Sequence, residues 1–122
     1  MLKNFILLAR NILLNNLQNR VRLLNVAVGD RKAKAILLLS RLSRGDSSIK
    51  KWHNSGSAGH VIVRMVPLDE ILVNEIACDL MKIDVEGAEI EVLKGLQSQY
   101  SKINNLIIEV HTSIVDINYI YK

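Results

Sequence analysis

One segment of the chain limits the possible folds more than any other, the stretch of residues 78–111. Apolar side chains predict a strand over residues 78–85 and another over residues 106–111. Residues 88–96 between them have the apolar spacing of a helix, and Gly95 marks its end. A strand, a helix and a second strand in this order require two parallel strands joined by a right-handed crossover. The chain is therefore expected to be an α/β protein.

The rest of the pattern predicts one long helix and three further strands, in a single domain without internal repeats or a linker. Polar residues recur at intervals of seven over residues 2–17, as in an amphipathic helix. The expected strands cover residues 21–28, 35–39 and 61–66. Residues 40–60 are rich in glycine and serine and too long for a tight turn, so we expect a mobile loop or an active-site cover.

Composition excludes several classes of protein. The chain has 122 residues and is 49% hydrophobic, which excludes a disordered chain, and its one cysteine, Cys78, excludes a disulfide scaffold. No apolar run approaches the ~20 residues of a membrane-spanning helix, because Arg10 and Asn11 interrupt the stretch at residues 5–14. That stretch is also a poor signal peptide, since no small-residue cleavage site follows it. We therefore expect a soluble cytoplasmic protein.

Charge is distributed unevenly along the chain. Residues 1–66 hold twelve Lys and Arg against two acids, whereas residues 67–122 hold four Lys against ten acids. This split has two interpretations, a basic face for an anionic partner or two oppositely charged halves that pack together in one domain. A nucleic-acid partner is not expected, because aromatic residues make up only 4% of the chain and leave few platforms for base stacking.

Three expected strand ends carry polar residues. Ligands of an open α/β sheet bind beyond the carboxyl ends of its parallel strands, which here lie at residues 27–30, 84–87 and 109–111. Asp84 is the most notable of these residues, because a carboxylate that leaves a row of buried aliphatic residues must find a donor, a cation or a ligand. Gly87 allows the sharp turn that follows it.

Carboxylates at helix starts also have a structural interpretation. Asp69 follows Pro67, which ends a strand, and is expected to cap a short helix. Glu86 and Glu89 stand at the start of the next helix, where the helix dipole favours a carboxylate by about 0.3–1 kcal/mol. Capping and function are therefore both open for these two glutamates.

The strands themselves hold further titratable residues. Lys82 and Glu109 lie inside apolar strands and are expected to form a buried, structural ion pair. His111 is a candidate base at the same sheet edge, with a purely structural strand-end histidine as the alternative. Cys78, the three histidines and the acids show no metal-ligand spacing, so no metal site is expected.

Several short blocks resemble the FkbM-type methyltransferase domain. They cover nearly the whole chain, and the block at residues 82–89 is the most specific. The blocks are Leu8-Ala9-Arg10-Asn11, Asn25-Val26-Ala27-Val28-Gly29-Asp30, Val66-Pro67-Leu68-Asp69, Lys82-Ile83-Asp84-Val85-Glu86-Gly87-Ala88-Glu89, Val92-Leu93-Lys94-Gly95 and Ile108-Glu109-Val110-His111.

This resemblance implies a Rossmann-like sheet and an S-adenosylmethionine-dependent methyltransferase. The implied reaction is methyl transfer to a hydroxyl of a sugar, a lipid or a secondary metabolite. By position, Ala27, Val28 and Asp30 would bind the methyl donor beside its adenine. The implied catalytic residues are Asp84, Glu86 and His111, which would face the sulfonium and the acceptor. Asp84 is the first choice and His111 the second for taking the hydroxyl proton.

The resemblance also implies an incomplete domain over residues 1–122. The family's first strand, glycine-rich turn, following helix and ribose-binding acid would precede Met1, and its last strands are not evident after His111. The strands at residues 21–28 and 78–85 would then not be neighbours, and their exposed apolar edges should promote self-association.

Two other interpretations remain open. The chain is a non-catalytic remnant or assembly partner in the first, with a basic loop that contacts an anionic group. That loop contains Arg41, Arg44, Lys50 and Lys51. In the second, the chain is a divalent-metal methyltransferase with Asp84 as a metal ligand.

Overall fold

The computed structural model describes residues 2–40, 57–113 and 115–120. The described chain alternates short helices and strands. In order these are α1 (Leu2–Leu14), β1 (Ala27–Val28), β2 (Ala33–Ser40), β3 (Ser57–Val66), α2 (Leu68–Ile71), β4 (Met81–Ile83), α3 (Glu89–Lys94), the 3₁₀ helix η1 (Tyr100–Lys102), β5 (Leu106–Ile108) and α4 (Ile117–Ile120).

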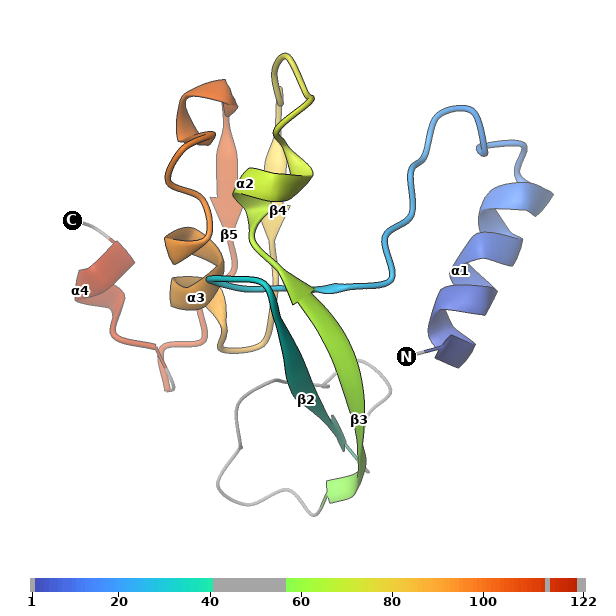
Figure 1. Cartoon of the computed structure of the whole chain (residues 1–122), viewed down its shortest axis with the longest axis horizontal. Coiled ribbons are helices and arrows are strands. Elements are labelled where there is room, and N and C mark those ends of the chain that lie inside the picture. Colours follow the sequence, from blue (N-terminus) through green and yellow to red (C-terminus); the bar gives the residue numbers. More distant parts are fainter. Residues whose placement is uncertain (1, 41–56, 114, 121–122) are drawn as a thin grey trace.

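The strands form two separate sheets (Figure 1). In the first, β3 is central, with β1 parallel on one side and β2 antiparallel on the other. The second consists of β4 and β5, which pair in parallel with α3 between them in the chain. The predicted α/β class and the predicted parallel pair are thereby confirmed. The described strands do not form one continuous sheet, and β1 and β4 are not neighbours.

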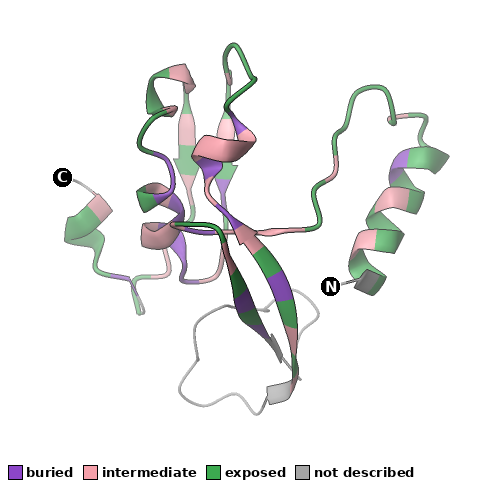
Figure 2. Ribbon diagram, in the orientation of Figure 1, coloured by how far each residue is buried: buried purple, intermediate pink, exposed green. Residues whose placement is uncertain are grey.

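The long hairpin of β2 and β3 buries only one of its faces (Figure 2). Ala35, Leu37 and Val63 form a small buried cluster on that face. The paired residues Ile36 and Ile62 face the other way and are 56% and 68% exposed. Both strands were expected and are longer than predicted. The loop predicted over residues 40–60 lies largely outside the described residues.

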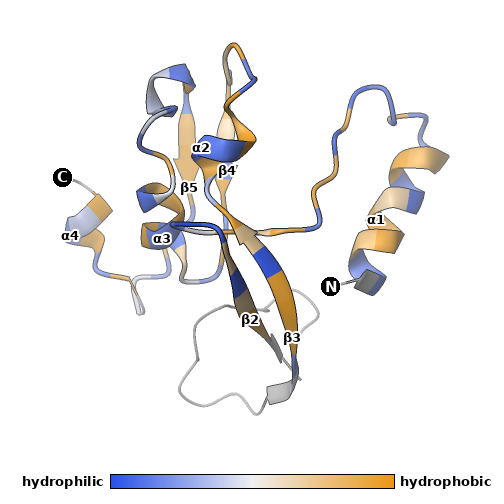
Figure 3. Ribbon diagram, viewed as in Figure 1, coloured by the Kyte–Doolittle hydropathy of each residue, from blue (hydrophilic) through white to orange (hydrophobic). Residues whose placement is uncertain are grey.

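The main core lies where α2, α3 and β4 meet. Its buried members are Leu68, Leu72, Ile83, Val92 and Leu96, and apolar residues of β1 and β5 pack against them. Figure 3 shows the apolar residues of β4 and β5, both of which contribute to this core. The helix predicted over residues 88–96 is confirmed in α3, and its apolar face points into this core.

Two backbone contacts join the sheets behind this core. A Cβ atom built on Gly95 would overlap the carbonyl oxygen of Gly29 and lie 3.2 Å from the Cα of Pro67. The end of α3 therefore approaches the end of β1 more closely than any side chain allows. The amide of Asp69 also donates to the carbonyl oxygen of Gly95 at 2.9 Å.

The predicted capping role of Asp69 is wrong. Pro67 is the N-cap residue of α2 and makes no side-chain cap bond. The Asp69 carboxylate instead accepts the backbone amides of Gln97, Ser98 and Gln99, at distances of 3.3 Å or less. These amides precede η1, so the carboxylate joins α2 to the turn that follows α3. The hydrogen bonds hold the pKa of Asp69 below its ordinary value despite the opposing effect of desolvation.

The N-terminal predictions hold only in part. The helix ends at Leu14 instead of continuing to residue 17, and it stands apart from the two sheets (Figure 1). The strand predicted over residues 21–28 is wrong for most of its length, because only Ala27–Val28 meets a partner strand. A strand needs a neighbour for its backbone hydrogen bonds, and residues 21–26 lead away from β3 instead of pairing with it (Figure 1). Among the described residues, no helix is long and apolar enough to cross a membrane.

Candidate functional site

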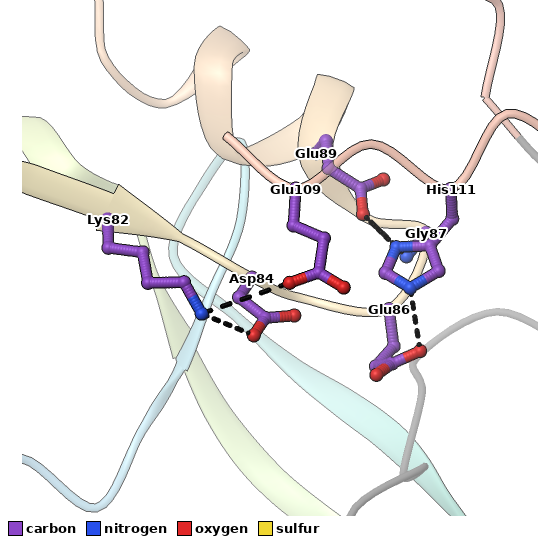
Figure 4. A network of polar contacts seen from close by, with 7 residues as sticks. All are labelled: Lys82, Asp84, Glu86, Gly87, Glu89, Glu109 and His111. Atoms are coloured by element: carbon purple, nitrogen blue, oxygen red, sulfur yellow. Dashed lines mark hydrogen bonds and ion pairs between the residues drawn. The ribbon is translucent and has the colours of Figure 1, made fainter. Parts of the chain in front are cut away.

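The parallel pairing of β4 and β5 brings two of the three expected strand ends together. The amide of Glu109 donates to the carbonyl oxygen of Ile83 at 2.9 Å, and this hydrogen bond holds the two strand ends side by side. Six polar side chains gather there around the turn that leads into α3 (Figure 4). We call them the strand-end cluster: Lys82, Asp84, Glu86, Glu89, Glu109 and His111.

The third expected strand end belongs to the other sheet. Gly29, just after β1, packs against Gly95, where α3 ends, whereas the strand-end cluster surrounds the start of α3. Ala27 and Val28 are half-buried, and Asp30 pairs with Arg31 at 2.7 Å. The single sheet edge expected for all three strand ends is therefore formed by two of them.

The turn between β4 and α3 has an unusual backbone. Glu86 and Gly87 have φ values of 51° and 94°, both in the left-handed region. Gly87 adopts it without strain, as expected for a sharp turn. For Glu86 this conformation costs about 1–2 kcal/mol and persists only where the surrounding contacts hold it. One such contact is to His111, whose Nε2 lies 3.1 Å from Glu86 Oε2.

His111 lies between two glutamates. Its Nδ1 donates to Oε1 of Glu89 at 2.8 Å, on the side opposite Glu86. Glu89 is fully buried, and the same Oε1 also accepts the backbone amide of Gly87 at 2.9 Å. The hydrogen bond to Glu89 raises the pKa of His111, and the charges of Glu86, Glu89 and Glu109 add to this increase. Burial works against it.

Glu89 keeps its negative charge in this buried position. Burial acts to raise its pKa, but the hydrogen bonds from His111 and Gly87 outweigh burial, so the pKa lies below the ordinary value. Ala88 is the N-cap residue of α3 and makes no side-chain cap bond. Glu89 therefore fastens the turn before α3 and holds His111 with the same oxygen.

The ion pair predicted to be buried is exposed. Lys82 Nζ lies 3.9 Å from Oε2 of Glu109, and the two side chains are 59% and 60% exposed. They lie on the outer face of the two-stranded sheet, where Ile107, the residue paired with Lys82, is also exposed. Lys82 instead donates to Asp84 at 2.8 Å. That hydrogen bond lowers the pKa of Asp84 and raises the pKa of Lys82.

Asp84 thus finds a cation, as expected of a carboxylate at this position. Asp84, Glu86 and His111, the three predicted catalytic residues, all belong to the strand-end cluster. Sequence reasoning did not connect Glu89 with His111. The available signal was that parallel strands would bring residues after 85 and after 108 to one edge, where a buried glutamate needs a partner.

A carboxylate and imidazole cluster at the carboxyl ends of parallel strands is suited to moving a proton on a bound ligand. The model of the methyltransferase FkbM domain matches residues 3–121. The chain belongs to the FkbM methyltransferase family. The strand-end cluster is therefore the candidate active site of an FkbM domain, and the resemblance stated from the sequence is confirmed.

One curated relative of this FkbM chain is the hexuronic acid methyltransferase AglP of Haloferax volcanii. The two are 31% identical over 64 residues, which are 51% of this chain and 27% of the relative. The matched region thus spans about a quarter of the length of the relative. No solved structure matches the chain significantly. In the part of the chain that the structure describes, no group of three or more His, Cys, Asp or Glu side chains is arranged to hold a metal ion.

Proposed function

We propose that this chain takes part in S-adenosylmethionine-dependent O-methyl transfer at the strand-end cluster. The observation that carries the proposal is the His111 network at the carboxyl ends of β4 and β5, in a chain of the FkbM family. The β4–α3–β5 unit is the kind of unit from which a Rossmann-like sheet is built. Ala27, Val28 and Asp30 would bind the donor, and Asp84, Glu86 and His111 would face the acceptor.

The reaction requires the protein to align the acceptor oxygen with the methyl group and to supply a proton acceptor. S-adenosylmethionine supplies a methyl group already activated by its sulfonium. A bond forms between the acceptor oxygen and the methyl carbon while the carbon–sulfur bond breaks, and the hydroxyl proton leaves to a base. Alignment of the reacting atoms contributes a large part of the rate, and a positioned base contributes typically about 10²–10⁴-fold.

The proposed acceptor is a hydroxyl group of a sugar, a lipid or a secondary metabolite. A uronic acid sugar is the first acceptor to test, because the relative named above is a hexuronic acid methyltransferase. Lys82 is the exposed cation of the strand-end cluster and could meet the carboxylate of such a sugar. The proposal includes action in the cytoplasm, which the free thiol of Cys78 supports.

Two measurements test the proposal. Calorimetric titration of the full chain with S-adenosylhomocysteine should release or absorb heat with saturation. Incubation with methyl-tritiated S-adenosylmethionine and a panel of uronic acid glycosides should then transfer label to the sugar. Neither binding nor transfer at millimolar ligand would refute the proposed function for this chain.

A second candidate function is assembly with a further copy of the chain. The observation that favours it is the exposed apolar surface of the hairpin, because Ile36 and Ile62 pair across its strands and are both more than half exposed. Contiguous exposed apolar surface of this kind often marks an interface. Sedimentation velocity distinguishes this candidate, since a monomer at all concentrations would exclude it.

A further inference from the structure

We infer that Glu89 positions His111 as the proton acceptor of the reaction, with Glu86 occupying the place that the acceptor hydroxyl takes. This inference rests on the proposed function and assigns separate roles within it. The sequence leaves capping and function both open for Glu89 and makes Asp84 the first choice as base.

Glu89 determines which ring nitrogen of His111 holds the proton. A carboxylate only accepts hydrogen bonds, so the 2.8 Å contact requires the proton of His111 to reside on Nδ1. Oε1 of Glu89 is held in turn by the Gly87 amide, and the side chain has no exposed surface. The carboxylate is therefore fixed in position. The lone pair of a neutral His111 then lies on Nε2 and points away from the core.

Glu86 lies at the other ring nitrogen of His111, on the side nearer to solvent. Its Oε2 lies 3.1 Å from Nε2 of His111 and accepts the proton of that nitrogen when the imidazole is charged. For His111 to act as the base, Nε2 first releases this proton to solvent, and the acceptor hydroxyl then takes the place of Glu86. The three side chains become more exposed from the inside outwards: Glu89 is fully buried, His111 is 18% exposed and Glu86 is 27% exposed. An acceptor that approaches from solvent would therefore meet Glu86 first and displace it from Nε2.

The surroundings of Asp84 make it a weaker proton acceptor than His111. Lys82 donates to its carboxylate at 2.8 Å, and this ion pair stabilises the charged form. A carboxylate in that state takes up a proton less readily than an ordinary aspartate. His111, in contrast, is surrounded by the carboxylates of Glu86 and Glu89, with Glu109 and Asp84 further out and Lys82 as the one cation of the cluster. A net negative surrounding favours proton uptake by the imidazole.

The proposed proton transfer and methyl transfer need no further reactant. The acceptor hydroxyl gives its proton to Nε2 of His111 while its oxygen takes the methyl group and the carbon–sulfur bond breaks. The products are the methyl ether, S-adenosylhomocysteine and an imidazolium that forms a charge-assisted hydrogen bond with Glu89. The imidazolium later releases its proton to water.

The test uses Glu89→Gln in the full chain, with Glu91→Gln on the same helix as the matched control. Glutamine keeps the size of the side chain, but its amide can donate to Nδ1 and thereby move the imidazole proton to Nε2. We expect kcat to fall about 10²–10⁴-fold with a smaller change in KM. The pH profile should shift, and ¹⁵N chemical shifts of His111 should report the changed tautomer. Glu91→Gln should leave all of these readouts at their wild-type values.

Two further variants decide between the bases. His111→Gln should lose as much activity as Glu89→Gln, and Asp84→Asn should lose less. A wild-type rate in Glu89→Gln, an unchanged tautomer, or a larger loss in Asp84→Asn than in His111→Gln would overturn the inference while leaving the proposed function in place. Absence of any methyl transfer by the wild-type chain would overturn the proposed function and the base role of His111 together.

Discussion

Replacement of Gly95 by alanine tests the backbone contact that joins the two sheets. Two effects of opposite sign compete at this position. Gly95 has φ of −82°, which alanine adopts readily, so the substitution should stabilise the protein by about 0.4–1 kcal/mol through the unfolded chain. In the folded chain, however, the added Cβ would overlap the carbonyl oxygen of Gly29 and lie 3.1 Å from its carbonyl carbon.

The steric effect should dominate, because the atoms in the way belong to the backbone. Gly29 and Pro67 cannot rotate aside as the end of a side chain could, and the sheets would have to move apart. Overpacking of this kind costs typically about 1–3 kcal/mol. The net prediction is a loss of about 1–2 kcal/mol in the free energy of unfolding, and the melting temperature of a chain of this size should fall by about 4–8 °C.

Urea unfolding followed by circular dichroism measures this loss. Gln97→Ala is the matched control, because its side chain is exposed two residues further on, and we expect a change within about 0.5 kcal/mol. An alanine variant at position 95 that is as stable as the wild type, or more stable, would show that the two sheets are not joined as described.

The other predictions concern one carboxylate, one imidazole and one exposed face. Asp69→Ala leaves three backbone amides without their acceptor and should cost about 1–3 kcal/mol in urea unfolding. The pKa of Asp69 is lowered in the folded chain, so its carboxylate contributes to the free energy of unfolding above the unfolded pKa. This contribution is lost as the pH falls through the folded pKa. Equal losses of stability in Asp69→Ala at pH 7 and at pH 2 would contradict the prediction. The pKa of His111 is raised, so its contribution is complete below the ordinary value of 6.5 and is lost as the pH rises through the folded value. NMR titration of the imidazole should therefore give a midpoint above 6.5, and a midpoint below 6.5 would refute the two-glutamate environment. Ile62→Lys should reduce self-association in sedimentation velocity with little change in stability, because Ile62 is 68% exposed; an unchanged oligomer distribution would remove the hairpin face from the interface.

Several predictions were wrong because the pattern of apolar residues shows which residues tend to be buried, and does not show which element packs against them. Lys82 and Glu109 lie in apolar strands, yet the sheet has only one covered face, so both remain exposed. Asp69 follows a strand-ending proline in the manner of a cap, but the nearest orphan amides belong to the turn at residues 97–99. The strand predicted over residues 21–28 has the right composition and, for most of its length, no neighbouring strand.

The sequence by itself determined the strand–helix–strand unit, because alternating elements at this spacing admit only parallel pairing. From that pairing followed the meeting of Asp84 and Glu86 with His111 at one edge, and the ordered blocks of residues identified the family. Only the tertiary structure decided that Glu89 holds His111, and that Gly95 is needed for a close contact and not for a left-handed turn. Both facts depend on distances of a few ångströms between residues far apart in the chain. Such distances follow from how the elements pack, which no local pattern of residue types records.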